Sequence, residues 1–368
     1  MDYNPYLRGA ESKGSLQQSK EGDEIKRIML DYIKAQAGDD IDYFNGLKSY
    51  VERGGHYMRP RILLDTARMF GVKIDRDIMK FAAAIELFGN AILMFDDIED
   101  RSLLRRGKPT IVNLYGNERG TNFATVLYDI SRQLLEEYMF SLKDEETRLR
   151  LWRTFNIIAK ETGYGQDLEL KFINSTKNFS AVDKSYYFEI VKRKTAAYSI
   201  YGPMQLAAVI AGRDDNTAEV LKSIGEPAGI AFQINDDIMD FMTAGRTGKE
   251  QYGDLYEGKY TLIMAYAYSK ASATEKAFID SVYAKDRKDK TKDEIDRLAS
   301  IVYNTGALED ALAERDNQMK EAISLSTKNI NYFGPTKEAI DFASMIMNEV
   351  RRNVIDINDV RKQKILNR

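Results

Sequence analysis

The chain has 368 residues, and its 54 lysines and arginines nearly balance its 57 acidic residues, so the formal net charge is −3. This balance gives no reason to expect nucleic acid or an anionic membrane as a partner. The absence of cysteine excludes disulfides and thiolate chemistry, and a single histidine, His56, leaves any metal chemistry to carboxylates. No apolar stretch approaches the roughly 20 residues of a membrane span, so we expect a soluble, cytoplasmic protein without stable membrane insertion.

The N-terminal part of the chain has a polar start followed by helical periodicity. Residues 1–22 are charged and aperiodic, and we expect them to form a mobile arm. Apolar residues then recur three and four positions apart over 25–32 and over 43–51, which predicts two helices. Because the chain has six prolines and no linker rich in glycine or serine, residues 23–368 are expected to form a single all-helical domain.

A glycine pair interrupts this periodicity. Gly54 and Gly55 permit a loop whose backbone approaches a ligand closely. The next predicted helix extends to about residue 70, and basic side chains, including His56 and Arg59, lie at its start. The loop and the helix start are therefore a candidate site for an anion.

An apolar run over 81–94 predicts a core helix, and it leads directly into an acidic cluster. Asp96 and Asp100 are four residues apart, which places both carboxylates on one face of the helix. Asp97 and Glu99 lie in the same turn. Four acids at the C-terminal end of a buried helix repel one another and interact unfavourably with the helix dipole. Bound cations would offset this repulsion.

The remainder of the chain also has a helical period. Helices are predicted over 117–140, 145–172, 183–210 and 215–242, with three or four more from 260 to about 353. Strand-type alternation is absent. The predicted class is therefore all-α, as a single large helical bundle with a central cleft.

Basic residues occur near the predicted cleft. Arg105 and Arg106 follow the acidic cluster and offer two forked donors for phosphate oxygens. Lys194 and its basic neighbours lie near the centre of a predicted helix, where a surface stripe would be the usual explanation. The loop 243–259 adds glycines and lysines, which combine flexible backbone with positive charge.

A second acidic cluster ends the helix predicted over 215–242. Asp236 and Asp240 again stand four residues apart after an apolar run. One such motif could equally be a solvated helix end beside a basic turn. Two copies, each after a core-type helix, are better explained as two carboxylate walls that face one cavity and hold hard divalent cations. With arginine and lysine nearby, the natural ligand for those cations is a diphosphate.

Taken together, these motifs resemble those of the trans-isoprenyl diphosphate synthase (polyprenyl synthetase) family over residues 54–261. The matching stretches, in chain order, are DDIED and RRGKPT from Asp96 to Thr110, GQ at Gly165, RKTAA from Arg193, FQINDDIMD from Phe232 and GDLYEGKYTL from Gly253. Any one of them alone would be weak, but six in the same order are specific.

The resemblance implies a fold of the isoprenoid synthase type with a central active-site cavity, and a homodimer. It also implies that an allylic diphosphate ionises and that isopentenyl diphosphate attacks the resulting cation head-to-tail. The implied cofactor is Mg²⁺, as three ions, with Mn²⁺ as a substitute. The released diphosphate accepts the final proton, so no separate protein base is implied.

The resemblance also implies roles for individual residues. The principal metal ligands would be Asp96, Asp100 and Asp236, supported directly or through water by Asp97, Asp237 and Asp240. The residues that face the allylic diphosphate would be Arg105, Lys194, Thr195, Gln233, Lys249 and Lys259. Lys194 and Lys259 would also take part in catalysis by stabilising the leaving group.

The isopentenyl diphosphate site departs from the family pattern. His56 stands where the family usually has lysine, and Gly89 stands where it has histidine or glutamine, whereas Arg59 and Arg106 are retained. Losing one charged contact to a phosphate costs about 1.5–3 kcal/mol, and a protonated His56 would recover part of it. Binding would then be weaker, another group would fill the space, or the acceptor would differ. Histidine at position 56 could also be a polar substitution without functional effect, in a loop that tolerates such substitutions.

The resemblance further bears on product length. In the family, the residue five positions before the first aspartate often limits growth when it is aromatic, and here that residue is Ala91, followed by Ile92. Phe88, one turn earlier, is the next bulky residue that could close the tunnel. Another helix could instead supply the floor through Phe123 or Tyr128. A product of geranylgeranyl length or longer is expected.

Three functions are compatible with these residues. Chain elongation uses both substrates. A terpene cyclase, or a prenyltransferase to another acceptor, would use the same ionisation without isopentenyl diphosphate, in keeping with the altered His56 and Gly89. A non-catalytic partner subunit is the third, but complete aspartate motifs argue against it because a silent partner has no reason to keep uncompensated carboxylates.

Overall fold

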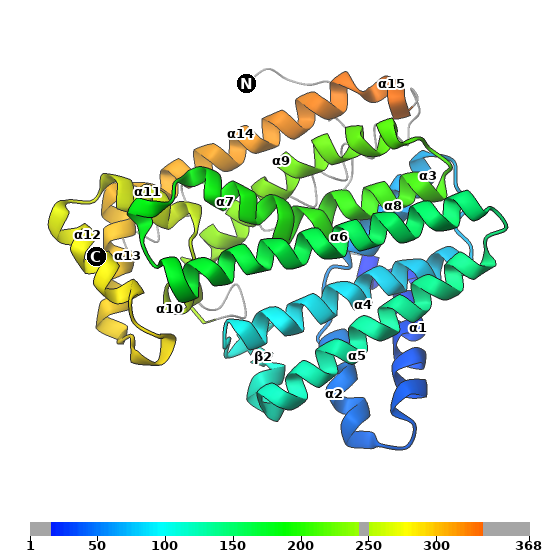
Figure 1. Ribbon diagram of the computed structural model, residues 1–368, viewed down its shortest axis with the longest axis horizontal. Coiled ribbons are helices and arrows are strands. Elements are labelled where there is room, and N and C mark those ends of the chain that lie inside the picture. The colour runs from blue at the N-terminus through cyan, green and yellow to red at the C-terminus, as the bar shows by residue number, and fades with distance from the viewer. Residues whose placement is uncertain (1–15, 243–249, 334–368) are drawn as a thin grey trace.

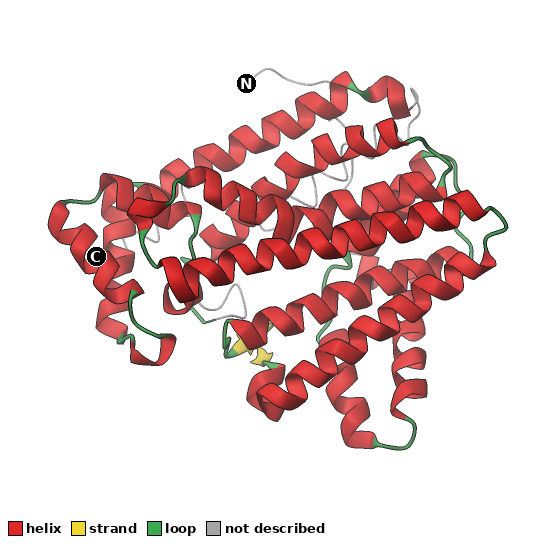
Figure 2. Ribbon diagram, in the orientation of Figure 1, coloured by secondary structure: helices red, strands yellow, loops and turns green. Residues whose placement is uncertain are grey.

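The computed structural model describes residues 16–242 and 250–333, and most of them lie in helices (Figure 2). The first elements are η2 (Leu16–Gln18), α1 (Lys20–Ala37), α2 (Ile41–Glu52), α3 (Met58–Met69), α4 (Arg76–Glu99), β1 (Leu104–Arg105), β2 (Lys108–Pro109), α5 (Ile111–Ser141) and α6 (Glu145–Lys171). They are followed by η3 (Phe172–Thr176), η4 (Phe179–Ala181), α7 (Lys184–Val191), η5 (Lys192–Tyr201), α8 (Gly202–Ile210) and α9 (Asp215–Asp240). The last are α10 (Gly253–Glu257), α11 (Leu262–Lys270), α12 (Ala273–Tyr283), η6 (Arg287–Asp289), α13 (Lys292–Thr305), α14 (Ala307–Lys328) and α15 (Ile330–Phe333). The predicted all-α class is confirmed.

The two helices that carry the acidic motifs occupy the middle of the bundle. α4 packs against α1, α3 and α5, and α9 packs against η5, α8 and α14. Figure 1 shows the long helices running along the length of the molecule, with α11, α12 and α13 gathered at one end. Both acidic motifs therefore lie inside one packed bundle.

Side-chain caps fix the start of both acidic helices. The carboxylate of Asp75 accepts a hydrogen bond from the backbone N–H of Ile78 at 3.0 Å, and that of Asp214 accepts one from Thr217 at 2.8 Å. Each cap places a negative charge at the positive end of the helix dipole. The opposite ends have no such compensation, because α4 and α9 both finish in aspartate-rich turns.

Three local features differ from the helices predicted by periodicity. The segment after the first acidic motif forms an antiparallel hairpin of β1 and β2, although no strand is expected there. α5 begins at Ile111 rather than 117, and Gly116 interrupts its first turns with a φ of 78°. The helix predicted over 183–210 is divided into α7, the π-helix η5 and α8. Periodicity alone does not distinguish a π-helix from an α-helix inside a continuous apolar segment.

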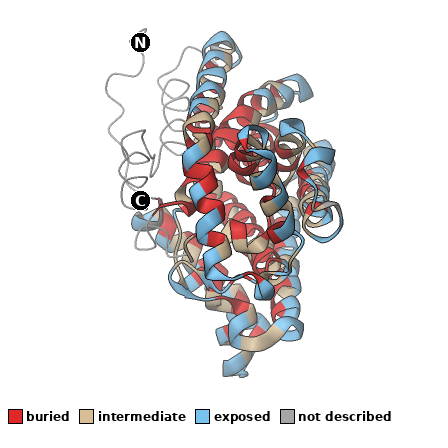
Figure 3. Cartoon of the chain, turned by 90° about the vertical axis from the view of Figure 1, so that its left-hand side faces the viewer, coloured by how far each residue is buried: buried red, intermediate tan, exposed pale blue. Residues whose placement is uncertain are grey.

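Buried side chains fill the interior of the bundle, and exposed ones cover its outer faces (Figure 3). α4 is the one described helix that is long and apolar enough to cross a membrane, and 78% of its apolar window is buried inside the protein. The expectation that no apolar stretch approaches the length of a membrane span was therefore wrong. The expected arm 1–22 overlaps η2 and α1, where Leu16 is buried against the core; residues 1–15 lie outside the described ranges.

Candidate active site

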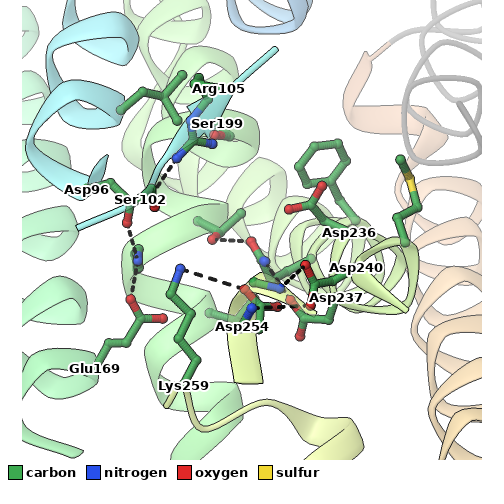
Figure 4. Close-up of a pocket in the computed structure, with 18 of the residues that line it drawn as sticks. Asp96, Ser102, Arg105, Glu169, Ser199, Asp236, Asp237, Asp240, Asp254 and Lys259 are labelled. Atoms are coloured by element: carbon green, nitrogen blue, oxygen red, sulfur yellow. Dashed lines mark hydrogen bonds and ion pairs between the residues drawn. The ribbon is translucent and has the colours of Figure 1, made fainter. Parts of the chain in front are cut away.

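A cavity of about 360 Å³ opens between α4, α6, η5 and α9. Figure 4 shows Asp96 and Glu169 on one side and the second aspartate motif on the other, with Lys259 between them. The lining includes these residues singled out by sequence: His56, Arg59, Ile92, Asp96, Arg105, Arg106, Lys194, Thr195, Gln233, Asp236, Asp237, Asp240 and Lys259. The candidate residues that do not line it are Phe88, Gly89, Ala91, Asp97 and Asp100, and Lys249 lies outside the described residues.

The first acidic wall combines two helices. Asp96 and Asp100 at the end of α4 and Glu169 of α6 bring carboxylate oxygens to within 4.8 Å of one another. Lys194 Nζ donates to Asp96 Oδ1 at 2.8 Å and also pairs with Glu169. Burial disfavours the charged form of Asp96, but Lys194 and Lys259 outweigh it and lower the pKa of this carboxyl. The wall therefore contains an ionised carboxylate held beside ammonium groups.

Lys259 joins this wall to the segment after α9. Its Nζ lies 2.6 Å from Asp100 Oδ2, 3.1 Å from Glu257 Oε2 and 3.9 Å from Asp254 Oδ1. Burial alone would lower the pKa of Lys259, yet Asp100 and Glu257 raise it well above the usual value. Burial raises the pKa of Asp100, and Lys259 only partly opposes this effect. Lys259 thus stays protonated, with the carboxyl groups of Asp100, Asp254 and Glu257 all close to its ammonium group.

Asp97, unlike Asp96, does not line the cavity. The Tyr50 hydroxyl donates to its Oδ2, and Arg105 Nε donates to both of its oxygens, at 2.9 and 3.1 Å. Arg105 also reaches Asp96 Oδ2 at 3.1 Å. Burial disfavours the Arg105 charge, but Asp97 outweighs it and raises the pKa of the guanidinium. In this arrangement Asp97 holds Arg105 in place.

The second acidic wall contains a hydrogen-bonded chain. Thr195 Oγ1 donates to Gln233 Oε1 at 2.8 Å, and Gln233 Nε2 donates to Asp237 Oδ1 at 2.8 Å. The Tyr187 hydroxyl donates to the other oxygen of Asp237 at 2.7 Å. Burial raises the pKa of Asp237 to about 6, and these two hydrogen bonds oppose the rise. Asp236 lines the cavity beside this chain.

Asp240 orders the backbone that leads to Lys259. Its two oxygens accept the N–H groups of Gly253 at 3.0 Å and Asp254 at 3.2 Å, the first residues of α10. Burial and the neighbouring Asp240 raise the pKa of Asp254 well above its usual value. Asp240 is therefore engaged at the start of α10, which ends two residues before Lys259.

Two glycines allow η5 to lie close to both acidic walls. A Cβ atom on Gly165 of α6 would come within 2.3 Å of the Lys194 backbone nitrogen. A Cβ atom on Gly229 of α9 would come within 2.3 Å of Ala196 Cβ. Such distances exclude any side chain, so glycine is required for this packing. The close approach brings Lys194 and Thr195 to the cavity between α6 and α9.

The side of the cavity that was expected to bind the acceptor diphosphate is basic, but its residues are arranged differently from the expected set. A Cβ atom on Gly89 would lie 2.9 Å from Arg59 Cδ and Cζ, so Arg59 fills the space that a larger residue would take. Its guanidinium lies 4.3 Å from the centre of the Tyr198 ring. Glu86 is buried behind it, and burial raises its pKa, although Arg59 and Arg106 oppose the rise. His56 is exposed at the rim.

The candidate chain-length residues lie below this part of the cavity. Phe88 and Ala91 are buried, and Ile92 lines the cavity wall. Three aromatic rings surround Phe88, at centroid distances of 5.7, 5.2 and 6.2 Å: Tyr128, Phe155 and Tyr198. Phe123 packs elsewhere, against Tyr43 and Tyr115. An aromatic layer under Tyr198, including Tyr128, is thus the candidate floor.

Sequence reasoning missed several residues of this site. Glu169 completes the first wall, Glu257 pairs with Lys259, and Tyr50 and Tyr187 hold the inner aspartates. Glu169 had a usable signal, since it lies three positions after Gln166 and so shares a face with it on α6. The two tyrosines had none, because a buried tyrosine in a helix is ordinary core composition.

The donor set suits a hard divalent cation. Carboxylate oxygens are the ligands that Mg²⁺ and Ca²⁺ prefer, and three of them converge at Asp96, Asp100 and Glu169. Neither oxygen of buried Asp100 receives a hydrogen bond of good geometry, even though Lys259 lies close. A buried carboxylate without hydrogen-bond donors is suited to a cation.

A helical bundle in which two acidic walls face a cavity that lysines and arginines also line suits a phosphate-bearing ligand bound with cations. Residues 43–302 match the family model described as polyprenyl synthetase. The chain therefore belongs to the polyprenyl synthetase family, whose enzymes transfer prenyl groups. The family and the enzyme class expected from the sequence are confirmed.

Named relatives agree with this assignment. The chain is 32% identical over 261 residues to the geranylfarnesyl diphosphate synthase of Aeropyrum pernix, covering 70% of this chain and 79% of the relative. It is 28% identical over 306 residues to the geranylgeranyl pyrophosphate synthase of Geoglobus acetivorans, covering 83% and 89%. The fold matches the crystal structure of polyprenyl synthase from Caulobacter crescentus CB15 complexed with calcium and isoprenyl diphosphate, with a TM-score of 0.76, 24% identity, and 91% and 95% of the two chains covered.

Proposed function

We propose that this prenyltransferase elongates an allylic diphosphate by head-to-tail condensation with isopentenyl diphosphate, using Mg²⁺, to give a product of geranylgeranyl length or longer. The observation that carries the proposal is the cluster of Asp96, Asp100 and Glu169, of which Asp96 and Glu169 line one cavity with Lys194, Lys259 and the second aspartate motif. The relatives named above make products of this kind, and the Caulobacter crescentus structure holds calcium with isoprenyl diphosphate.

In this proposal, different residues of the cavity hold the metal ions, support those ligands and bind the diphosphate. Asp96, Asp100 and Asp236 would hold three Mg²⁺ ions, which supply positive charge against the departing diphosphate. Asp97 would support this set from behind, through Tyr50 and Arg105, whereas Asp237 and Asp240 line the cavity and would support it directly or through water. Lys194, Thr195 and Lys259 lie where they can donate hydrogen bonds to diphosphate oxygens.

The apolar part of the cavity protects the reaction. Ile92 and Leu93 of α4 line it beside Asp96, and the aromatic layer around Phe88 lies below. An allylic cation in such surroundings is shielded from water, which would otherwise add to it. The acceptor diphosphate would bind at Arg59 and Arg106, with His56 at the rim.

The decisive experiment uses purified protein, Mg²⁺ and labelled allylic diphosphates, with and without isopentenyl diphosphate, and sizes the products by chromatography. Elongated products that require isopentenyl diphosphate support the proposal. Cyclised or transferred products formed without it would identify a terpene cyclase or a different acceptor. No turnover from an otherwise folded, metal-binding protein would identify a non-catalytic subunit.

We further propose that the enzyme is a cytoplasmic homodimer. Apolar side chains are exposed along the outer faces of α5 and α6, where Phe140 is 75% exposed and Ile157 is 55% exposed. A second copy of this chain would cover such side chains. Light scattering on the purified protein measures the number of subunits directly, and a monomer at micromolar concentration contradicts the proposal.

The acceptor site yields a prediction about affinity. His56→Lys should lower the KM for isopentenyl diphosphate about threefold to tenfold, because it adds a permanent charge at the rim. Adding Gly89→His should cancel this gain, since its Cβ would displace Arg59. Steady-state kinetics of the single and double variants test the pair. A double variant that binds better than His56→Lys would show that Arg59 moves aside at no cost.

The aromatic floor yields a prediction about product length. Ala91→Phe should shorten the product, because it adds a ring beside the wall, and Phe88→Ala should lengthen it, because it opens the layer under Tyr198. Phe81→Ala is the matched control, since Phe81 lies on the same helix but packs against Tyr138. Chromatography of the products measures the change. If neither variant alters the length, the floor is formed by other residues.

A further inference from the structure

Lys259 is surrounded by more carboxyl groups than one ammonium group can pair with closely. Asp100, Asp254 and Glu257 all lie within 3.9 Å of its Nζ. Glu257 is engaged at both oxygens, because its Oε1 accepts the Ser102 hydroxyl at 2.9 Å while its Oε2 lies 3.1 Å from Lys259 Nζ. If Lys259 alone balanced Glu257, little of its charge would remain for a ligand.

A second cation reaches Glu257 from outside the family motifs. Arg287 of η6 extends from the connection between α12 and α13, and its Nη1 lies 3.2 Å from Glu257 Oε1. Its Nη2 pairs with Glu250, and its guanidinium lies 5.6 Å from the centre of the Tyr256 ring. Arg287 is 13% exposed and Glu257 is 8% exposed at the side chain, so solvent screens this pair little.

The same connection also holds the backbone before Lys259. Lys290 is buried, and its Nζ donates to the carbonyl oxygens of Leu255 at 2.8 Å and Tyr256 at 2.9 Å. These carbonyls belong to the last turn of α10, where a cation is favourable. Gly258, with a φ of 79°, then turns the chain so that Lys259 enters the cavity. Lys290 and Arg287 thus hold the consecutive residues Leu255, Tyr256 and Glu257, just before Lys259.

We infer that Arg287 and Lys290 are positioning residues for Lys259: Arg287 neutralises and orients Glu257, and Lys290 fixes the end of α10. The ammonium of Lys259 then remains available to the diphosphate of the allylic substrate. The inference rests on the proposed function, in which Lys259 contacts that diphosphate. Lys290 does not line the cavity, whereas Arg287 does, with its guanidinium paired to Glu257 and Glu250. On this inference both residues act through the segment that precedes Lys259.

The electrostatics agree with the geometry. Burial would raise the pKa of Glu257, but Lys259 and Arg287 outweigh it and lower that pKa. Without Arg287 the buried carboxylate would have Lys259 as its main counter-charge. The ammonium would then be drawn toward Glu257 and away from a ligand, which weakens diphosphate binding more than it alters the later chemistry.

Arg287→Met tests the inference in the full-length enzyme. Binding of inorganic diphosphate in the presence of Mg²⁺, measured by calorimetry, should weaken about tenfold, the effect of one weakened charged contact. The KM for the allylic diphosphate should rise to the same extent, with kcat and the KM for isopentenyl diphosphate within about twofold of wild type. Arg287→Lys should recover part of the loss, and Lys290→Met should change affinity in the same direction. Lys288→Met is the matched control because Lys288 is exposed and adjacent.

A double-mutant cycle distinguishes positioning from a general effect of charge. In a Glu257→Gln background, Arg287→Met should cost little further affinity, because the carboxylate through which it acts is gone. An equal loss in both backgrounds, or unchanged diphosphate affinity in Arg287→Met, would overturn the inference while leaving the proposed function in place. If the wild-type protein itself fails to bind diphosphate with Mg²⁺, the proposed function fails first, and the inference falls with it.

Discussion

Replacing Asp96 with alanine is expected to reduce turnover at least about a thousandfold, because it removes a carboxylate that both faces the metal-binding cluster and holds Lys194 and Arg105. Asp236→Ala should have a comparable effect from the opposite wall. No histidine or cysteine is available in the cavity to replace either ligand, since the chain has a single histidine, at the rim, and no cysteine. Activity should also disappear in excess EDTA and return with Mg²⁺.

A loss of turnover in these variants must be distinguished from a loss of folded protein. Removing Asp96 takes one of two acidic partners from each of the buried cations Lys194 and Arg105, so the loss of stability should stay below about 3–5 kcal/mol, the cost of breaking a buried ion pair. Asp96→Asn keeps the shape and should lose activity while unfolding near the wild-type temperature. Asp77→Ala, at the other end of α4 and half exposed, is the control for the loss of an acid. Full turnover in EDTA, or an active Asp96→Asn, would refute the metal-ligand role.

Replacing Lys194 with methionine is expected to lower kcat/KM for the allylic diphosphate about 10-fold to 150-fold, the range for one charged contact of about 1.5–3 kcal/mol. Lys194 lies between Asp96 and Glu169, and the methionine keeps its apolar stem while removing the charge. Both binding and departure of the diphosphate should suffer, so KM should rise and kcat should fall.

Lys192→Met is the matched control for this variant, because it removes the same charge two residues earlier on η5. Circular dichroism of both variants should remain helical. Inhibition by inorganic diphosphate gives a second measure, and it should weaken in Lys194→Met alone. Equal losses in both variants would indicate that net positive charge, and not the position of Lys194, governs binding.

Much of the site follows from helical geometry. Spacing of four residues predicted that Asp96 and Asp100 share a face, and both lie at the acidic cluster. The same geometry explains why Asp97 differs, because each residue is rotated by about 100° from the previous one on a helix of 3.6 residues per turn. Asp97 therefore points to Tyr50 and Arg105.

Other features depend on contacts that sequence spacing does not report. Glu169 reaches the cluster only because Gly165 lets α6 approach η5. The effect of having glycine at position 89 depends on Arg59, which lies on another helix and occupies the space that a side chain at position 89 would take. Arg287 supports Lys259 through Glu257, which lies 30 positions earlier in the sequence. Arg287 itself belongs to a connection between helices that has no motif of its own. Such pairs require the packed bundle.

The lysine–aspartate pairs have a consequence for how ligands assemble in the cavity. In the structure, the carboxylates that suit a divalent cation are paired with the two ammonium groups that suit a diphosphate. Each ligand therefore has to separate a pair before it can bind well, and each leaves behind the partner that the other needs. Metal and diphosphate should bind with positive cooperativity, and because linkage is reciprocal, each should raise the affinity for the other by the same factor.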